Sequence, residues 1–273
     1  PKISKTSRCW PLPEETMTVS RRSFVQRSAA TVAAASLGNR FAIAQDSPIR
    51  IGTIFDLSGP FAAAGSVPSS IGTQIAIDLV NERGGVAGKY KVQAINADSQ
   101  SKADAAINEV ERLINQEKVD IVVGVYSSAH AVPLAAKMQE QKKILWITTA
   151  VATSVVKGRN LTYTFRAQVH SDQYGQASAG FLADNAKAKL GKEPADIKVA
   201  VIHEDGPYGV GVGEAGERFA KEKGFQVAMR EGYSSAAPDL SSLVTKLKRA
   251  QADIILHTGY NPDITLFWRQ ARE

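Results

Sequence analysis

The chain has 273 residues, of which 44% are hydrophobic and 22% charged, a composition typical of globular proteins. Its formal net charge of +6 is concentrated at the N-terminus, because the first 44 residues carry seven Lys or Arg and only two Glu. The rest is almost neutral, which argues against a nucleic-acid-binding protein, since such proteins present a basic face to phosphates. The only cysteine is Cys9, so the sequence predicts no disulfide framework and no thiolate metal cluster in the remainder of the chain.

The N-terminal segment has the pattern of an export signal. Met17 is the first plausible initiator, so we interpret residues 1–16 as an upstream tail or translation artefact. Residues 17–44 contain the pair Arg21-Arg22 followed by Ser-Phe-Val and then an Ala-rich stretch. A charged start followed by a modest apolar stretch is typical of a secretory signal, and the arginine pair resembles the twin-arginine motif. The alternative is an amphipathic N-terminal helix with a chance Arg-Arg pair.

The signal ends in a small-residue cleavage pattern, Ala42-Ile-Ala44, which predicts Gln45 as the mature N-terminus. No cysteine lies near that site, so we expect no lipid attachment there. The sequence therefore predicts an exported, soluble, periplasmic protein.

From Ile49 onward, short β-branched runs alternate with amphipathic stretches. Apolar residues three and four apart predict helices, marked by Ile71, Ile75 and Leu79; Val110, Leu113 and Ile114; Leu134 and Met138; Phe219; and Leu240, Leu243 and Leu247. The predicted strands are Ile49–Phe55, Tyr90–Asn96, Asp120–Val125, Ile144–Thr148, Lys198–His203, Gln226–Arg230 and Asp253–Leu256. This alternation predicts an α/β fold of mostly parallel sheets flanked by helices. A long crossover at 149–197 divides it into two lobes, expected at 45–155 and 156–273.

Small polar residues and aromatic residues follow the predicted strands. In open parallel sheets, ligands bind beyond the carboxyl ends of the strands, where helix N-termini converge. In the first lobe these ends carry hydroxyl-rich segments such as Tyr126-Ser-Ser-Ala-His130 and Thr148–Ser154. In the second lobe they carry Gly206-Pro-Tyr-Gly and Thr258-Gly-Tyr-Asn-Pro. Two lobes with such complementary chemistry predict a cleft for a small zwitterion.

Five motifs occur in one order along the chain: Ile51-Gly-x-x-x-x-Leu-Ser-Gly-Pro, Asn81-x-x-Gly-Gly-Val-x-Gly, Asp98-Ser-Gln, Gly124-x-Tyr-Ser-Ser and Tyr208-Gly-x-Gly. In this order they resemble the branched-chain amino-acid binding proteins, which are periplasmic type I solute receptors of ABC importers. The resemblance runs from about Ile49 to Glu273. Since family members continue further, it implies a C-terminally truncated receptor whose second lobe is incomplete.

The resemblance implies a receptor that captures a small amino acid, most readily a branched-chain one, and delivers it to a membrane permease. We expect no enzymatic activity, no cofactor, no metal and no nucleic-acid partner. Ser127 matches the family's carboxylate-binding serine, and Ser128 adjoins it where a strand ends and a helix begins. A simple helix N-cap is the alternative explanation for a serine there.

The Thr148–Ser154 loop matches the segment that binds the ligand's ammonium and carboxylate groups, but two registers remain open. One places Ala150 and Ala152 at the contacts, and the other places Val151 and Thr153 there, of which Thr153 keeps a hydroxyl. Tyr208 and Tyr260 match the aromatic residues that close over the ligand from the second lobe, with ordinary packing as the alternative. In relatives, the acidic residue of the ammonium site would lie beyond Glu273.

A different class of function is suggested by Gly211-x-Gly213-x-x-Gly216 with Glu231 further on, a literal dinucleotide-binding pattern. It would make the chain an exported NAD-dependent oxidoreductase. However, the first glycine of that motif should lie in the tight turn directly after a strand, and Gly211 lies well past the predicted strand end at His203. We therefore favour the receptor over the oxidoreductase.

Overall fold

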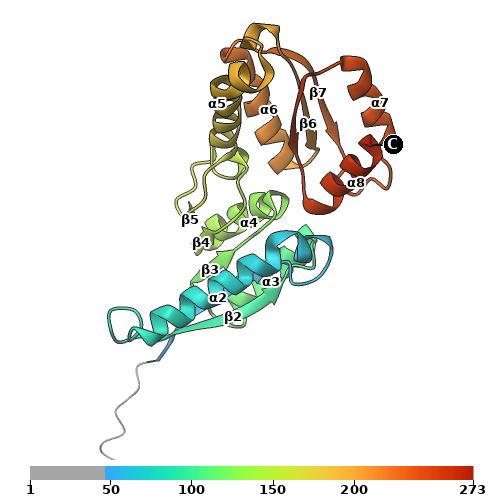
Figure 1. The fold of residues 1–273 in the computed structure, drawn as a ribbon. Helices are drawn as coiled ribbons and strands as arrows, with labels where there is room; N and C mark the ends of the chain where they lie inside the picture. Colours follow the sequence, from blue (N-terminus) through green and yellow to red (C-terminus); the bar gives the residue numbers. More distant parts are fainter. Residues whose placement is uncertain (1–46, 273) are drawn as a thin grey trace, which may run out of the picture. The chain divides into compact units, whose positions relative to one another are not determined.

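The computed structural model describes residues 47–272, so the predicted signal residues Arg21, Arg22, Ala42 and Ala44 lie outside the described part. The described part contains two parallel β-sheets, each with its own helices (Figure 1). This architecture confirms the expected α/β class with helix-flanked parallel sheets. No helix among residues 47–272 is both long enough and apolar enough to cross a bilayer.

The first sheet has five strands in the spatial order β2-β1-β3-β4-β5, and every neighbouring pair is parallel. The strands are β1 (Ile49–Phe55), β2 (Val92–Asp98), β3 (Ile121–Gly124), β4 (Ile144–Ile147) and β5 (Thr164–Arg166). Its helical elements are η2 (Ala62–Ser66), α2 (Val67–Glu82), α3 (Ala103–Asn115), α4 (Ser128–Gln141) and η3 (Thr153–Val155).

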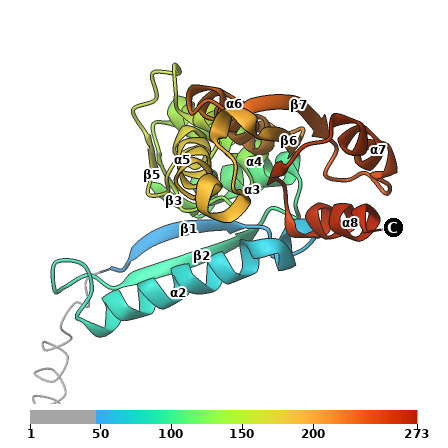
Figure 2. The same ribbon diagram turned by 45° about the horizontal axis from the view of Figure 1, so that its top comes forward.

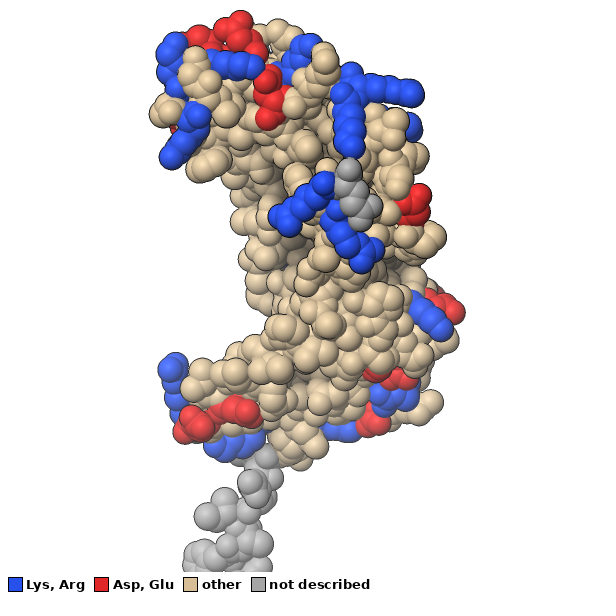
Figure 3. All heavy atoms as spheres, turned by 45° about the vertical axis from the view of Figure 1, so that its right-hand side comes forward, with Lys and Arg blue, Asp and Glu red and all other residues tan. Residues whose placement is uncertain are grey.

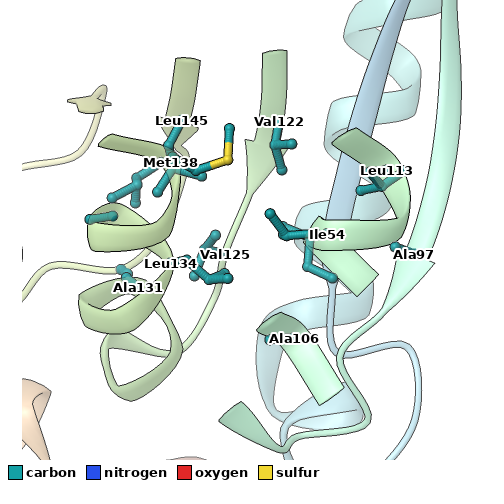
Figure 4. Close-up of a cluster of buried hydrophobic side chains, with 14 of the residues drawn as sticks. Ile54, Ala97, Ala106, Leu113, Val122, Val125, Ala131, Leu134, Met138 and Leu145 are labelled. Carbon is teal, nitrogen blue, oxygen red and sulfur yellow. The ribbon is translucent and has the colours of Figure 1, made fainter. Parts of the chain in front are cut away.

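Side chains alternate between the two faces of this sheet, as the pleat of a strand requires. Ile54, Val122 and Leu145 point to the face covered by α3 and α4, where they are almost fully buried. Figure 4 shows Leu134 and Met138 of α4 on this side, in the cluster that also contains Val122 and Leu145. The main core of the first lobe therefore lies on one face of its sheet.

Among residues 47–272, α2 is the helix that covers the other face of the first sheet, and it packs along β1 and β2 at one side of that sheet (Figure 2). Ile77 is the one residue of α2 that is buried. The predicted helix is present, but Ile71, Ile75 and Leu79, which share one side of it, do not face the sheet. Between 45% and 54% of each of these side chains is exposed, because α2 turns its Thr73, Ile77 and Val80 side to the sheet instead.

The second sheet has three parallel strands in the order β7-β6-β8. They are β6 (Lys198–Glu204), β7 (Gln226–Tyr233) and β8 (Ile254–Thr258), with α5 (Ser171–Leu190), η4 (Pro194–Asp196), α6 (Pro207–Glu222), α7 (Ser241–Ala250) and α8 (Asn261–Ala271). Both faces are covered. Val199 and Val201 pack with Ala186 of α5 and Ala220 of α6. Ala200 and Ile202 pack with residues of α7 and α8 on the opposite face.

The seven predicted strands all exist, within two or three residues at each end. A strand and a long helix inside the segment expected as a crossover, 149–197, were not predicted. One is β5, which is only three residues long and pairs with β4, so that the first sheet extends to Arg166. The other is α5, whose 20 residues contain small and polar side chains rather than a clear apolar stripe. Short strands and weakly amphipathic helices carry little periodic signal.

Candidate functional site

The turn between β3 and α4 has an unusual backbone conformation. Gly124 has φ of 131°, and a Cβ atom there would lie 2.3 Å from the carbonyl oxygen of Ile54, so only glycine fits. Val125 follows with φ of 68°, a left-handed conformation that β-branched residues rarely adopt. Its N–H donates to Ile54 O and its carbonyl accepts from Ala150 N, and these bonds hold it in place. Such strain is typical of functional sites, and here it directs Tyr126 and Ser127 into position.

Ser127 is the N-cap residue of α4, and its backbone carbonyl accepts hydrogen bonds from His130 N and Ala131 N. Its hydroxyl makes no capping bond, however, and is completely buried without any hydrogen-bond partner. The first turn of α4 also contains no acidic side chain to neutralise the positive end of the helix dipole. A buried hydroxyl without a partner at such a helix start is suited to binding an anionic group.

Ser128 differs from its neighbour because its hydroxyl oxygen accepts a hydrogen bond from Ala152 N at 3.1 Å. This bond ties the Thr148–Ser154 loop to the start of α4. Within the loop, Ala150 and Ala152 are buried. Arg166 donates to the carbonyl of Ala152. Thr153 begins η3, and its buried hydroxyl also lacks a partner.

A pocket of about 120 Å³ lies between the strand ends of the two sheets. The first lobe lines it with Tyr126, Ser128, Thr149 and Val151. The second lobe lines it with Gln168, Tyr174, Tyr208, Gly259 and Tyr260. Of the predicted site residues, the structure therefore brings Ser128, Tyr208 and Tyr260 to one pocket. Val151 also lines it, whereas Ser127, Ala150, Ala152 and Thr153 are not among its lining residues. The walls carry hydroxyl, amide and aromatic groups but no charged side chain.

Aromatic rings from both lobes meet at this pocket. The ring of Tyr260 lies 4.5 Å from Phe61, 5.4 Å from Tyr208 and 6.1 Å from Tyr126, measured between centroids. Burial raises the pKa of Tyr208 to about 12 and raises the pKa of Tyr260 further, so both phenols are neutral hydrogen-bonding groups at physiological pH. The nearby Ser127 hydroxyl has a smaller and opposite effect, because it lowers the pKa of Tyr260. The two hydroxyls do not, however, form a hydrogen bond of ordinary geometry.

Two buried carboxyl groups support the second-lobe wall of the pocket. Glu204, at the end of β6, accepts hydrogen bonds from Gly206 N and Gly209 N at the start of α6, which carries Tyr208. Asp263 accepts from Tyr260 N at 2.9 Å and from the Tyr233 hydroxyl at 2.5 Å, and so fixes the start of α8. Burial raises the pKa of both carboxyl groups above their ordinary values.

A third buried carboxyl group lies on the first-lobe side, at the end of β1. Asp56 accepts from the Ser99 hydroxyl at 2.7 Å and lies 3.4 Å from His130 Nδ1. Its second carboxylate oxygen has no partner. Among residues 47–272, no three His, Cys, Asp or Glu side chains come together as a possible metal site.

Several residues at the pocket were not predicted as site residues, namely Phe61, Tyr126, Thr149, Gln168 and Tyr174. Tyr126 could have been predicted from the sequence, because it directly precedes Ser127 in the motif Gly124-x-Tyr-Ser-Ser. Gln168 and Tyr174 belong to the missed β5–α5 region, and nothing local distinguishes them from surface residues. They reach the pocket only because the chain crosses there from the first sheet to the second.

The glycine pattern that suggested dinucleotide binding lies inside α6 and not in a turn after a strand. A Cβ atom at Gly213 would lie 2.4 Å from the His203 ring, and one at Gly211 would lie 2.7 Å from the Ser171 hydroxyl. These glycines therefore allow α6 to pack closely against β6 and α5. The oxidoreductase interpretation is wrong, because the pattern serves helix packing.

The comparison with known families agrees with this fold and pocket. The family described as periplasmic binding protein matches residues 48–273 of the chain. The chain belongs to this family. It is a family of binding proteins and not of enzymes, which confirms the resemblance inferred from the ordered motifs.

The periplasmic binding proteins most similar to this chain include the Leu/Ile/Val-binding protein homolog 7 of Brucella suis biovar 1 (strain 1330). It is 35% identical over 225 residues, which are 82% of this chain and 55% of that protein. The crystal structure of the leucine-binding protein LivK from Thermotoga maritima MSB8 superposes with a TM-score of 0.72 at 28% identity, covering 82% of this chain and 60% of that one. The isoleucine complex of LivJ from Streptococcus pneumoniae superposes with a TM-score of 0.69 at 24% identity. This match covers 82% of this chain and 61% of that one.

The chain therefore spans little more than half the length of the relatives it matches.

Proposed function

We propose that this chain is the solute-capturing part of an ABC-importer receptor, which binds a small amino acid and presents it to a membrane permease. Branched-chain amino acids are the leading ligands. Family membership and the names of the Brucella and Thermotoga relatives support this class of ligand. The observation that carries the proposal is the buried Ser127 hydroxyl, which has no partner and lies at the start of α4 beside a pocket lined by both lobes.

In the proposed complex, the ligand carboxylate binds at the N-terminus of α4, where the Ser127 hydroxyl and the helix dipole favour an anion. Ser128 holds the Thr148–Ser154 loop against that helix, so that the loop can offer backbone groups to the ligand. Tyr208 and Tyr260 contact the ligand from the second lobe. Because the ligand touches both lobes only when they are close together, it stabilises the closed form of a hinge motion.

A ligand screen by thermal shift tests this proposal, with the receptor at its natural length. A ligand at a hundred times its dissociation constant raises the free energy of unfolding by about 2.7 kcal/mol. We expect leucine, isoleucine or valine to raise Tm and glycine or simple amines to leave it unchanged. A protein that responds to none of the amino acids or carboxylates in the screen contradicts the proposed function.

The aromatic lining favours a second candidate ligand, a small aromatic carboxylate. Four tyrosines line the pocket and could stack on a ring, while no described charged side chain there is available for an ammonium group. Hydroxybenzoates are therefore a separate arm of the same screen. A response to them alone would keep the receptor function but replace the amino acid by an aromatic acid.

We also propose that residues 17–44 direct export through the twin-arginine pathway and that the mature receptor acts in the periplasm. The Arg21-Arg22 pair and the Ala42-Ile-Ala44 cleavage pattern support this. Family membership agrees with a periplasmic location.

A further inference from the structure

Four of the residues that line the pocket are tyrosines from separate segments. Tyr126 follows β3, Tyr174 lies in α5, Tyr208 lies in α6, and Tyr260 directly precedes α8. The rings of Tyr126 and Tyr208 are tilted by 44° and 54° against that of Tyr260, so neither stacks face to face on it. Ring faces therefore remain for a ligand, and an aromatic face attracts a cation because its π-electrons carry negative charge.

Three buried carboxyl groups lie near this wall without a basic partner that is charged at neutral pH. Asp56, Glu204 and Asp263 are each at most 3% exposed. Among residues 47–272, no Lys or Arg pairs with Glu204 or Asp263, and the one ion-pair contact of Asp56 is with His130, whose pKa is lowered by burial. Most acidic groups on the face shown in Figure 3, in contrast, have Lys or Arg beside them.

The negative charge of these carboxyl groups reaches the tyrosines. After burial, which is the larger cause, Asp56 and Asp263 raise the pKa of Tyr126. Glu204 likewise adds to the effect of burial on the pKa of Tyr260. A negative potential that disfavours a phenolate favours a cation in the same place. The pocket therefore combines ring faces with a negative potential, although no carboxylate is among its lining residues.

The proposed anion site adjoins this pocket. Ser128 lines the pocket, and the unpartnered Ser127 hydroxyl lies near the Tyr260 hydroxyl. A ligand whose carboxylate binds at the start of α4 would thus place its positive group among the tyrosines. A primary ammonium group carries three N–H donors and is held most strongly by a carboxylate that touches it, which this wall lacks. Methyl groups on the nitrogen remove those donors and leave the kind of cation that aromatic cages bind.

We infer that the pocket binds a methylated ammonium group, so that the ligands of this receptor include betaines, which are amino acids with a trimethylated nitrogen. The inference rests on the proposed function, since it takes the ligand carboxylate to bind at Ser127, and it adds the chemical class of the ligand's cationic end. The pocket volume of about 120 Å³ suits a small head group such as trimethylammonium.

The test is an N-methylation series, measured by calorimetric titration of the receptor at its natural length. Glycine, N,N-dimethylglycine and glycine betaine share one carboxylate and differ only in the methyl groups on nitrogen. We expect affinity to rise along the series, with glycine betaine at least about tenfold tighter than glycine. The matched control is 3,3-dimethylbutanoate, which has the shape of glycine betaine but no positive charge. It should bind at least about tenfold more weakly than glycine betaine.

Two substitutions of Tyr208 separate the role of the ring from that of its hydroxyl. Tyr208→Phe keeps a ring face and should weaken betaine binding only a few-fold. Tyr208→Leu keeps an apolar side chain without a ring and should weaken it at least about tenfold further. The two variants should bind 3,3-dimethylbutanoate equally weakly, which a merely structural role of Tyr208 would not produce. If Tyr208→Leu does not fold, the same pair of substitutions at Tyr174, which is 37% exposed, replaces it.

Leucine and 4-hydroxybenzoate are titrated alongside, so that two kinds of failure can be told apart. Binding of either one with no response to glycine betaine would overturn this inference and leave the proposed receptor function in place. Equal affinity for glycine betaine and 3,3-dimethylbutanoate would also overturn it, because the pocket would then select by shape alone. No response to any amino acid, betaine or carboxylate would contradict the proposed function itself, and this inference with it.

Discussion

Ser127 and Ser128 are neighbours in the sequence, yet their hydroxyls have different environments. That of Ser127 is buried without a partner, whereas that of Ser128 accepts the Ala152 N–H across 24 positions of the chain. Substitutions of the two serines should therefore distinguish an effect on ligand binding from an effect on stability.

Ser127→Ala should leave the free energy of unfolding almost unchanged, since no hydrogen bond is lost in the unliganded protein. It should weaken ligand binding about ten- to hundredfold, because a hydrogen bond to a charged group contributes about 1.5–3 kcal/mol. Calorimetric titration and urea unfolding of the receptor at its natural length measure the two effects.

Ser128→Ala is the control, and its main effect should be on stability. It leaves the buried Ala152 N–H unpaired, which costs about 1–3 kcal/mol. If Ser127→Ala binds as tightly as the parent protein, Ser127 does not contact the ligand.

His257 should make stability depend on pH. Burial lowers its pKa to about 4, from an ordinary value of 6.5. Tyr233 donates to Asp263, so the 2.8 Å contact between Tyr233 and His257 uses the Nε2–H of the imidazole, and the buried Nδ1 has no partner. A second proton would have to sit on Nδ1. The unfolded chain therefore takes up that proton more readily, and stability is lost as pH falls from 6.5 towards 4.

The expected loss reaches about 3 kcal/mol at the acid end of this range. Urea unfolding at pH 7.5 and at pH 4.5 measures it, with His257→Gln as the control, because glutamine keeps a donor for Tyr233 but does not titrate. Glu204 and Asp263 act in the opposite direction, since their raised pKa values favour the folded state at low pH. The difference between parent and variant removes that contribution, and equal pH profiles would exclude the role of His257.

At the scale of elements, helix α6 shows how a glycine pattern can have a packing role. Gly213 lies against the His203 ring, whereas the nearest atom to a Cβ at Gly216 is Leu256 Cδ1 at 3.6 Å, an ordinary contact distance. Both residues have helical backbones inside α6.

Gly213→Ala should destabilise the protein by about 1–3 kcal/mol through overpacking against β6. Gly216→Ala should instead stabilise it by about 0.5–1 kcal/mol, because alanine is the better helix former and meets no close contact. Thermal or urea unfolding of the two variants checks these opposite signs. Equal destabilisation by both would contradict the packing explanation.

At the scale of the whole molecule, the proposed export signal lies outside the described residues 47–272. Replacing both Arg21 and Arg22 by lysine should keep the precursor in the cytoplasm, because the twin-arginine pathway requires the arginine pair. Cell fractionation measures the distribution, and mass spectrometry of the exported protein should find Gln45 at its N-terminus. Export of the lysine variant through the general secretory pathway would contradict the twin-arginine assignment but not the periplasmic location.

The sequence by itself determined the α/β class, the family and most strand positions. These depend on local features: β-branched runs, apolar residues three or four apart, and short motifs in a fixed order. Val110, Leu113 and Ile114 of α3 and Leu134 and Met138 of α4 are buried as their spacing predicts.

Only the tertiary structure decided which residues meet. Tyr126, the segment from Gln168 to Tyr174, and Tyr260 are far apart in the chain and share a pocket because two sheets place their strand ends together. The free hydroxyl of Ser127, the packing role of Gly213 and the exposure of the apolar stripe on α2 likewise depend on neighbours distant in sequence. A local pattern shows that a side chain is apolar or polar, but its burial and its partners are set by elements that the chain contributes from elsewhere.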